Sequence, residues 1–491
     1  MTMTLGWRVF PRLYRDSVTL MAAASVAEKT PGAEKVAAMM ATPGNQRIMA
    51  DAGMWPADLS AAPDDLVVSI RARVDDVALA LEAFETALAG GGESVTAAVA
   101  APGTLVEALA ATPGATVATV SVPGAYAPVV VEQALELGLH VFCFSDNISV
   151  DDEVRLKAIA RERGLLLMGP DCGTAILDQT PLGFANVVRH GSVGIVAASG
   201  TGAQEVSVLL DRWGVGVSQL IGVGGRDLSA EVRGEMTHAA LERLAADEET
   251  EVLMVVSKPP AGEVGSALLD LLADLATADR PVVACLLGAP DTGRVGGDSL
   301  LVRGTLEGAA VAAVNLLGKT VDLLEPDAPP TPTGTSILGL FTGGTLASEA
   351  KIVLARHGVT ATIHDLGDDQ YTAGKPHPMI DPTPRNEWIA TRVDADILLV
   401  DVVLGHGSHA DPAGELAGAV AAAQAARAAH GRAPLTVIAS VTGTDADPQS
   451  FPHQVVTLTA AGITVAPTNA AAARIAARLT GATIPAEGVP S

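Results

Sequence analysis

Two turns of small residues carry the clearest chemical signal in this chain of 491 residues. The first turn is Ser199-Gly200-Thr201-Gly202, and the second is Thr342-Gly343-Gly344-Thr345. Each follows an apolar run that predicts a strand and precedes a pattern that predicts a helix, so backbone N–H groups and the positive end of the helix dipole meet there. One such turn is equally compatible with a plain connection, but two copies predict a phosphate held between two helix N-termini.

Three residues are candidates for catalysis. Lys258 follows a predicted strand, where it suits either a bound anion or a simple exposed position. His377 and Asp381 lie in the Pro-rich run 374–382. A rigid polar loop is often functional, although its prolines can also serve only to stop regular structure. The pattern makes His377 a candidate general acid–base, and Lys258 and Asp381 complete the set of catalytic candidates.

Five residues are candidates for substrate binding. Arg226 and Arg294 could clamp a phosphate or carboxylate, or could pair with acidic side chains. Asp171 and Cys172 lie in a Gly-rich segment after a predicted strand, where a buried structural thiol is the alternative for Cys172. Asn469 completes this set.

Metal and cofactor signals are weak in this sequence. Asp401, His406 and His409 lie close together, but their spacing matches no zinc pattern, so we expect no metal. No Gly-x-Gly-x-x-Gly run follows a strand, so we expect no nicotinamide or flavin cofactor.

Composition limits the partners. The 31 basic and 56 acidic residues give a net charge of −25, which repels nucleic acid and anionic lipid. No apolar run reaches the ~20 residues of a membrane span. The three cysteines are sparse and far apart, which favours a reducing compartment. Arg8, Arg12 and Arg15 before an apolar run only weakly resemble an export signal, so we expect a cytoplasmic protein.

The elements that position these residues alternate between strands and helices, which predicts an α/β protein with parallel sheets. In the first domain we expect strands at Ser17–Leu20, Lys35–Met40 and Leu66–Ile70. The expected parts are an N-terminal α/β domain (1–92), a shortened Rossmann-like domain (93–190), a flavodoxin-type domain (191–323), a Pro-rich linker (324–335) and a last α/β domain (336–491).

Several of these motifs resemble succinyl-CoA synthetase. The runs 199–225 and 169–173 resemble its α subunit, and the last domain resembles the C-terminal domain of its β subunit. The runs 374–382, 401–405 and 441–444 are similar to motifs of FdrA-like proteins, which join both halves in one chain. The resemblance implies several Rossmann-like and flavodoxin-like parallel-sheet domains, as in succinyl-CoA synthetase.

Two departures from the synthetase pattern affect its chemistry. Gly297 stands where the synthetase family has a phosphorylated histidine, so a phosphohistidine cannot form there. The Gly-rich loop that holds CoA has no counterpart before Thr104, and the ATP-grasp domain is missing from this sequence.

The FdrA-like motifs imply a transferase. Such proteins form one subunit of a carbamoyltransferase in allantoin-type purine catabolism, which links an N-carbamoyl acid (oxalurate, N-carbamoyl-oxamate) and phosphate with carbamoyl phosphate and oxamate. The resemblance implies that the chain binds carbamoyl phosphate or phosphate and a small ureido or oxamate-type acid. It also implies a homo- or hetero-oligomer with the other subunits of that complex. The alternatives are an acyl-CoA synthetase (NDP-forming)-like ligase subunit and a non-catalytic assembly subunit.

Overall fold

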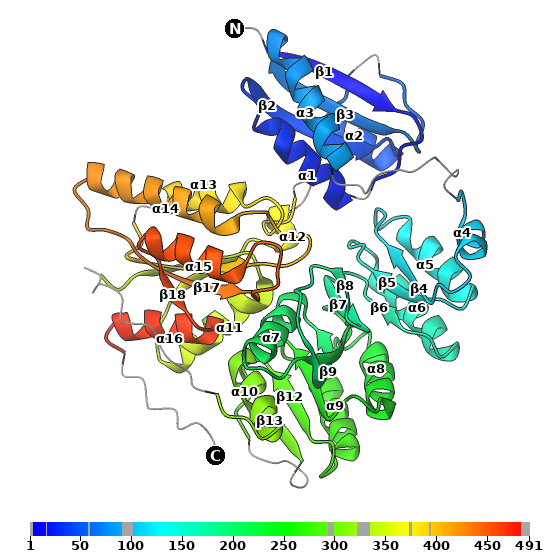
Figure 1. Cartoon of the computed structure of the whole chain (residues 1–491), viewed down its shortest axis with the longest axis vertical. Helices are drawn as coiled ribbons and strands as arrows, with labels where there is room; N and C mark the ends of the chain where they lie inside the picture. Colours follow the sequence, from blue (N-terminus) through cyan, green and yellow to red (C-terminus); the bar gives the residue numbers. More distant parts are fainter. Residues whose placement is uncertain are drawn as a thin grey trace. The chain divides into compact units, whose positions relative to one another are not determined.

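The computed structural model describes residues 3–15, 17–56, 59–90, 102–292, 299–321, 334–372, 376–391 and 394–482. The chain forms two compact units (Figure 1). The first unit, called the N-terminal unit, consists of Met1–Thr112 and Thr372–Asp381, and the second consists of Pro113–Tyr371 and Pro382–Ser491. Arg294, Gly297 and most of the expected linker lie outside the described residues.

The N-terminal unit is a three-stranded antiparallel sheet of order β1-β3-β2 with helices on its faces. Its elements are β1 (Met3–Phe10), α1 (Ser17–Glu28), β2 (Ala33–Met40), α2 (Pro43–Asp51), β3 (Leu66–Arg73), α3 (Val77–Gly90) and α4 (Leu105–Ala111). The strand expected at Ser17–Leu20 is wrong, because these residues begin α1. Leu20, Ala23 and Ala27 are buried at helical spacing, and this packing outweighs the local β-propensity of Val18 and Thr19.

The second unit begins with a small parallel sheet of order β4-β5-β6. Its elements are β4 (Val117–Val120), α5 (Ala127–Glu136), β5 (His140–Cys143), α6 (Val150–Glu162) and β6 (Leu167–Met168). The loops after the three strands lie together at one edge, as the strand order predicts. Ser145 Oγ donates to Val122 O over 2.6 Å, and Asp171 N donates to Ser145 O over 3.0 Å.

Residues 174–321 form the middle lobe, a seven-stranded sheet of order β13-β12-β11-β9-β10-β7-β8. Its strands are β7 (Thr174–Leu177), β8 (Thr180–Gly183), β9 (His190–Ala198), β10 (Val217–Gly222), β11 (Val252–Ser257), β12 (Val282–Leu286) and β13 (Leu300–Arg303). Its helices are α7 (Gly200–Arg212), α8 (Glu235–Ala246), α9 (Gly262–Leu275) and α10 (Leu306–Leu316). The antiparallel hairpin β7–β8 was not expected from the sequence.

Residues 334–371 and 382–482 form the C-terminal lobe, a parallel sheet of order β15-β14-β16-β17-β18. Its strands are β14 (Ile337–Phe341), β15 (Thr362–Asp365), β16 (Ile397–Val403), β17 (Thr436–Thr442) and β18 (Thr464–Ala466). Its helices are α11 (Gly344–Arg356), α13 (Thr383–Thr391), α14 (Pro412–Ala429), α15 (Phe451–Ala460) and α16 (Asn469–Leu479). The short α12 (Asp369–Thr372) ends at the first residue of the segment that belongs to the N-terminal unit.

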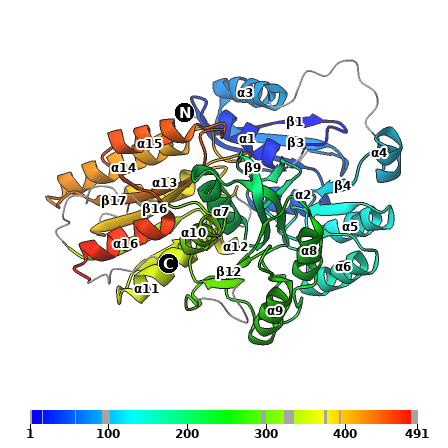
Figure 2. The ribbon, with the colours of Figure 1, turned by 60° about the horizontal axis from the view of Figure 1, so that its bottom comes forward.

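The parallel strands of the two lobes have the same order. In each lobe the first strand lies between the second and the third, which is the flavodoxin-like arrangement and confirms the expected fold class. Helix α7 follows the first strand of one lobe and α11 follows the first strand of the other, so the two helices occupy equivalent positions. Helices α7, α10, α11 and α16 pack side by side where the lobes join (Figures 1 and 2).

Candidate functional site

The N-terminal ends of α7 and α11 meet where the two lobes join. Ser199 Oγ lies 2.6 Å from Thr345 Oγ1, and Thr345 N donates to Thr201 Oγ1 over 3.3 Å. Ser199 also caps α7, because its hydroxyl accepts from Gly202 N over 3.1 Å. The structure therefore brings together the two turns that the sequence singled out. We call this meeting point the helix junction, and its binding of phosphate stays a prediction.

Small residues allow this close approach. A Cβ atom on Gly202 would lie 2.4 Å from Ser199 Oγ and 2.9 Å from Thr345 Cγ2. A Cβ atom on Gly343 would lie 3.0 Å from the side chain of Thr201. Larger residues at either position would push the helices apart.

A buried carboxylate of the chain itself already binds part of the second turn. Thr342 N and Gly343 N each donate to Asp401 over 2.7 Å, and Thr342 Oγ1 donates over 3.0 Å. Asp401 is paired in turn with Arg385 at 3.2 Å, and both side chains are fully buried. An external anion at α11 must therefore use donors other than Thr342 and Gly343.

Asp365 is a second acidic group at the helix junction. It ends β15, and its Oδ2 lies 2.3 Å from the position that a Cβ atom on Gly344 would take. Burial raises the pKa of Asp365 to about 6, against the lowering effects of a hydrogen bond from Gly367 N and of the charge of Lys258. A half-buried carboxyl group with this pKa can exchange protons near neutral pH.

The sequence analysis missed Asp365 and Arg385. An aspartate that ends a strand next to the first strand of a parallel sheet is a signal that could have identified Asp365. Arg385 lies within α13, and nothing in its local sequence distinguishes it from a surface arginine.

The three predicted catalytic residues are divided between the two units. Lys258 is an exposed residue directly after β11 in the second unit, and its charge acts on Asp365. His377 and Asp381 belong to the N-terminal unit. Burial lowers the pKa of His377 to about 4, so its imidazole is neutral at pH 7. His377 Nδ1 accepts from Met379 N over 3.2 Å, which fits a structural loop as well as a catalytic one.

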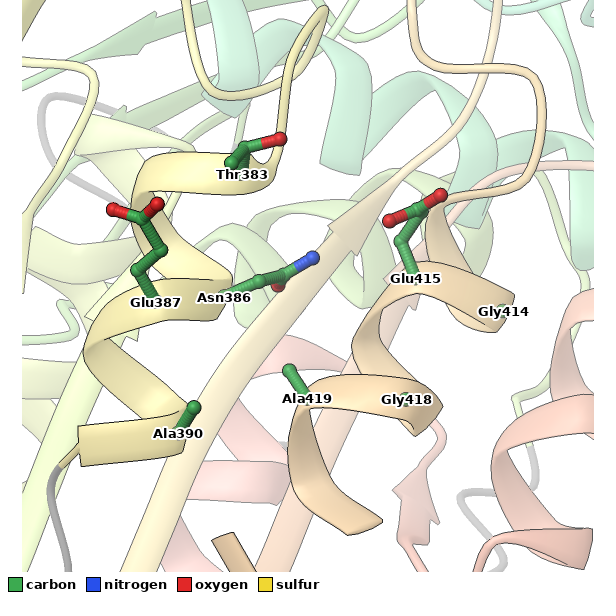
Figure 3. Close-up of a pocket in the computed structure, with 8 residues that line it drawn as sticks. All are labelled: Thr383, Asn386, Glu387, Ala390, Gly414, Glu415, Gly418 and Ala419. Atoms are coloured by element: carbon green, nitrogen blue, oxygen red, sulfur yellow. The ribbon is translucent and has the colours of Figure 1, made fainter. Parts of the chain in front are cut away.

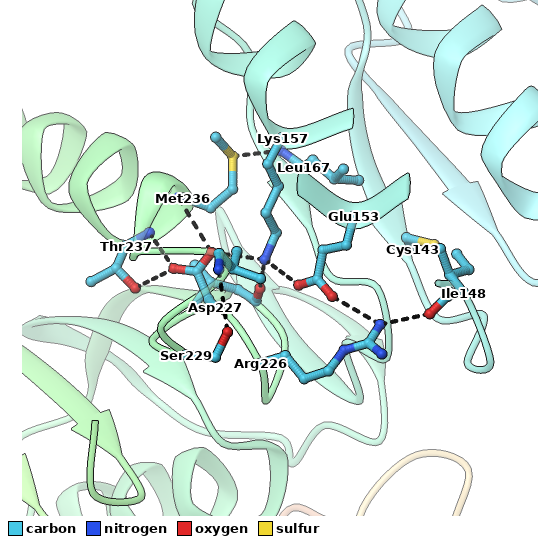
Figure 4. Close-up of polar contacts among 12 residues, drawn as sticks. Cys143, Ile148, Glu153, Lys157, Leu167, Arg226, Asp227, Ser229, Met236 and Thr237 are labelled. Atoms are coloured by element: carbon cyan, nitrogen blue, oxygen red, sulfur yellow. Dashed lines mark hydrogen bonds and ion pairs between the residues drawn. The ribbon is translucent and has the colours of Figure 1, made fainter. Parts of the chain in front are cut away.

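Arg226 takes part in a network of charges around Lys157 (Figure 4). Lys157 Nζ lies 2.7 Å from both Glu153 Oε1 and Asp227 Oδ1, and all three side chains are fully buried. Arg226 pairs with Glu153 Oε2 at 2.8 Å and donates to Ile148 O over 2.9 Å. This network joins α6 to the loop after β10, so Arg226 already has protein partners.

The other substrate-binding candidates are also engaged by the protein. Asp171 N is bonded to the loop after β5, and Cys172 is buried, which raises its thiol pKa to about 12. Such a thiol stays protonated at neutral pH and is a poor nucleophile. Asn469 is buried and donates through Nδ2 to Glu349 over 2.8 Å and to Leu346 O over 3.0 Å, which ties α16 to α11.

A groove of about 390 Å³ lies between α13 and α14, away from every residue named so far as a candidate (Figure 3). Small residues on α14 open it, and Asn386 points across it toward that helix (Figure 3). It is lined by Thr383, Asn386, Glu387, Ala390, Gly414, Glu415, Gly418 and Ala419.

The described residues contain no group of three or more His, Cys, Asp and Glu side chains placed to hold a metal ion. Among the same residues no helix is long and apolar enough to cross a membrane. Cys143, Cys172 and Cys285 are all free thiols, and all three are buried.

Comparisons with known proteins agree with this architecture. A family model described as "CoA-ligase" matches residues 340–479, and one described as "AllF, heavy metal-associated domain" matches residues 3–102. "Uncharacterized protein YahF" of Escherichia coli (strain K12) is 38% identical over 492 residues, which cover 93% of this chain and 95% of YahF.

Some relatives that match only part of this chain have names that state an activity. The ADP-forming succinate–CoA ligase subunit alpha-2 of Trichomonas vaginalis is 31% identical over 203 residues, which cover 38% of this chain and 62% of that subunit. The ADP-forming sulfoacetate-CoA ligase subunit SauD of Bilophila wadsworthia (strain 3_1_6) is 29% identical, with 41% and 71% covered. A solved dinucleotide forming acetyl-coenzyme A synthetase 1 of Ca. Korarchaeum cryptofilum is 16% identical with a TM-score of 0.34, and covers 74% of this chain and 82% of its own.

The paired flavodoxin-like lobes and the CoA-ligase match show a fold like that of the succinyl-CoA synthetase domains. Within this class, the chain belongs to the family of Escherichia coli YahF.

These relatives correct the expected enzyme class. The expected transferase, a carbamoyltransferase, is wrong, because the matched domain and the named relatives are CoA ligases. The expectation depended on short motifs in three runs, whereas the ligase similarity extends over whole lobes.

Proposed function

We propose that this chain is an acyl-CoA synthetase (NDP-forming)-like ligase subunit whose helix junction holds the phosphoryl group of an acyl phosphate. The observation that carries the proposal is the 2.6 Å contact between Ser199 and Thr345, which aims two helix N-termini at one place. Two aligned dipoles favour a negatively charged phosphoryl group. Gly297 excludes a phosphohistidine at the synthetase position, so the acyl phosphate itself is the species to be held.

The chemistry needs charge stabilisation and one proton transfer. A thiol attacks the carbonyl carbon of the acyl phosphate, so that a C–S bond forms and the C–O bond to phosphate breaks. The phosphate leaves with the electron pair of that bond, and N–H groups and Lys258 stabilise its charge. Asp365 accepts the thiol proton, which suits a carboxyl group with a pKa of about 6.

Partners belong to the same proposal. Two of the named relatives are single subunits of ADP-forming ligases, so we expect another subunit of the assembly to make the acyl phosphate. The FdrA-type assignment and a cytoplasmic location are further parts of the proposal.

Thermal unfolding with acetyl phosphate and with inorganic phosphate tests the binding site. A ligand at 100 times its Kd stabilises the native state by about 2.7 kcal/mol, so binding raises the Tm. The Ser199→Ala variant should lose this rise relative to its own ligand-free state, whereas Ser266→Ala, on the exposed face of α9, should keep it. An unchanged rise in Ser199→Ala would contradict the assignment of the helix junction.

Thioester formation tests the reaction. The chain with acetyl phosphate and CoA, assayed alone and with its separately purified partner subunits, should form acetyl-CoA and phosphate. Anion binding without any thioester in either assay would refute the ligase reaction while leaving the site in place.

A second candidate function is a non-catalytic subunit of such an assembly. The hydrogen bonds from Thr342 N and Gly343 N to Asp401 favour this function, because these two N–H groups already have an acceptor within the protein. A chain with this function would show no Tm change with either phosphate compound, yet would still co-purify with its partners.

A further inference from the structure

The N-terminal unit matches a domain described as heavy metal-associated, but its residues do not suit a heavy metal. Soft metal ions in proteins are held by thiolates, imidazoles and, for Cu(I), thioethers. The first histidine of this chain is His140 and its first cysteine is Cys143, so the matched residues 3–102 contain neither.

Thioethers are the only sulfur groups in the matched segment, and they pack as apolar side chains. Met49 and Met54 are fully buried in a cluster with Leu59 and Val67. The acidic group Asp65, which could otherwise bind a cation, accepts hydrogen bonds from Arg12 N and Ala62 N. The unit therefore keeps the fold of a metal carrier without its donor set.

The same unit contains a segment from far along the chain. Thr372–Asp381 belongs to the same compact unit as Met1–Thr112, although the chain on both sides of it belongs to the second unit. We call its described part, residues 376–381, the clasp. Within the clasp Pro378, Met379 and Ile380 are buried, and the last two are 6% and 7% exposed.

The sequence of the clasp stiffens it for this packing. The carbonyl of His377 accepts from Ile380 N over 2.8 Å and from Asp381 N over 3.0 Å, which closes a tight turn. Proline at 376, 378 and 382 limits the conformations of the free segment, so less entropy is lost when it packs. The neutral, half-buried imidazole of His377 also fits an apolar contact.

We propose that the N-terminal unit does not bind a heavy metal, and that it functions instead as an intramolecular binding domain for the clasp. The contact includes buried apolar side chains of the clasp. The charge of Asp381 adds to burial in raising the pKa of Glu28, so the acidic groups at this contact repel one another. Burial of the apolar side chains of Met379 and Ile380 supplies the favourable free energy of this contact.

In the sequence, the clasp lies between residues that form or support the helix junction. Asp365 lies seven residues before Thr372, and Arg385 lies four residues after Asp381. Asp365 belongs to the helix junction, and Arg385 pairs with the buried Asp401 that binds the second turn. The chain therefore connects the N-terminal unit to the junction from both sides, whatever ligand the junction holds.

Metal titration of the full chain tests the first half of the proposal. The protein is incubated with Cu(I) or Zn²⁺, desalted, and its metal content is measured. We expect far less than one equivalent of either metal per chain. One equivalent retained by the wild type and lost in Met49→Leu or Met54→Leu would overturn the proposal.

Hydrogen exchange of the full chain tests the second half. Ile380→Asp should increase amide exchange several-fold in the N-terminal unit while α7 and α11 keep wild-type rates. Val74→Asp, at a site in the same unit that is 60% exposed, is the control and should change little. The milder Ile380→Ala should give a smaller increase of the same pattern if the aspartate variant does not fold. Wild-type exchange in both Ile380 variants would overturn the clasp.

Discussion

Ser199 Oγ and Thr345 Oγ1 lie 2.6 Å apart, although 146 residues separate them in the sequence. Each hydroxyl belongs to the first turn, or the cap, of the helix that follows the first strand of its lobe. The contact is therefore where the two equivalent helices of two similar sheets face each other. Its geometry depends on small residues, and this dependence gives the first prediction.

Gly202→Ala should separate the helices. Its Cβ atom would lie 2.4 Å from Ser199 Oγ and 2.9 Å from Thr345 Cγ2, so atoms of both lobes must move. Overpacking of this kind costs about 1–3 kcal/mol of unfolding free energy. Urea denaturation measures the change. Gly418→Ala on α14 has no atom within 4 Å of its Cβ atom and should instead gain about 0.5–1 kcal/mol, because alanine is the better helix former. Equal effects of the two substitutions would contradict the tight junction.

Local pattern was sufficient to predict part of this architecture. The strand–turn–helix signal at Ser199 and at Thr342 is contained within a few residues, so the turns and the parallel sheets could be predicted. Asp365 and Arg385 acquire their environments from segments distant in sequence, and no local pattern records this. His377 differs from these residues, because its local sequence did suggest a function. The Pro-rich loop that suggested a catalytic site is part of the N-terminal unit.

The environment of Lys157 also could not be predicted from local sequence, and it gives the second prediction. Glu153 and Lys157 are four residues apart on α6, a spacing typical of an exposed helix face, yet both are fully buried. Lys157→Met removes the counter-charge of the buried Asp227 and leaves the buried Glu153 with Arg226 alone. Removing one partner of a buried ion pair typically costs about 3–5 kcal/mol. Thermal and urea unfolding should show this loss, whereas Lys351→Met at an exposed position of α11 should be close to neutral.

Glu349 predicts that stability decreases as the pH rises. Burial raises its pKa to about 7, and the charges of Glu205 and Glu307 add to this against a hydrogen bond from Asn469. The glutamate of the unfolded chain ionises first, near its ordinary pKa of 4.5, so stability falls between that pH and about 7 and then levels. The difference corresponds to about 3 kcal/mol if Glu349 titrates alone.

The Glu349→Gln variant isolates this effect. It should lower stability at pH 5, because the glutamine amide cannot accept both the hydrogen bond from Leu306 N and the one from Asn469 Nδ2. It should also flatten the pH dependence measured by urea denaturation between pH 5 and 8. Glu263→Gln, at an exposed site on α9, should retain the wild-type slope. A wild-type slope in Glu349→Gln would assign the titration to another group.

Asp365 predicts a pH dependence of anion binding at the helix junction. Its carboxyl group lies against Gly344, so its negative charge opposes an anion there, and its protonation removes that opposition. Sulfate is a suitable probe, because it stays a dianion over this range and does not titrate itself. The sulfate affinity should therefore fall as the pH rises above about 6, by at most about tenfold per pH unit for one proton.

Isothermal titration with sulfate from pH 5 to 8 measures this dependence. In Asp365→Asn the affinity should stay near its low-pH value across the whole range, since the amide carries no charge to repel the anion. Asp270→Asn, an exposed position on α9, should reproduce the wild-type curve. A pH-independent affinity in the wild type would show that the anion does not approach Asp365, and would then place the bound phosphoryl group closer to Ser199 than to Gly344.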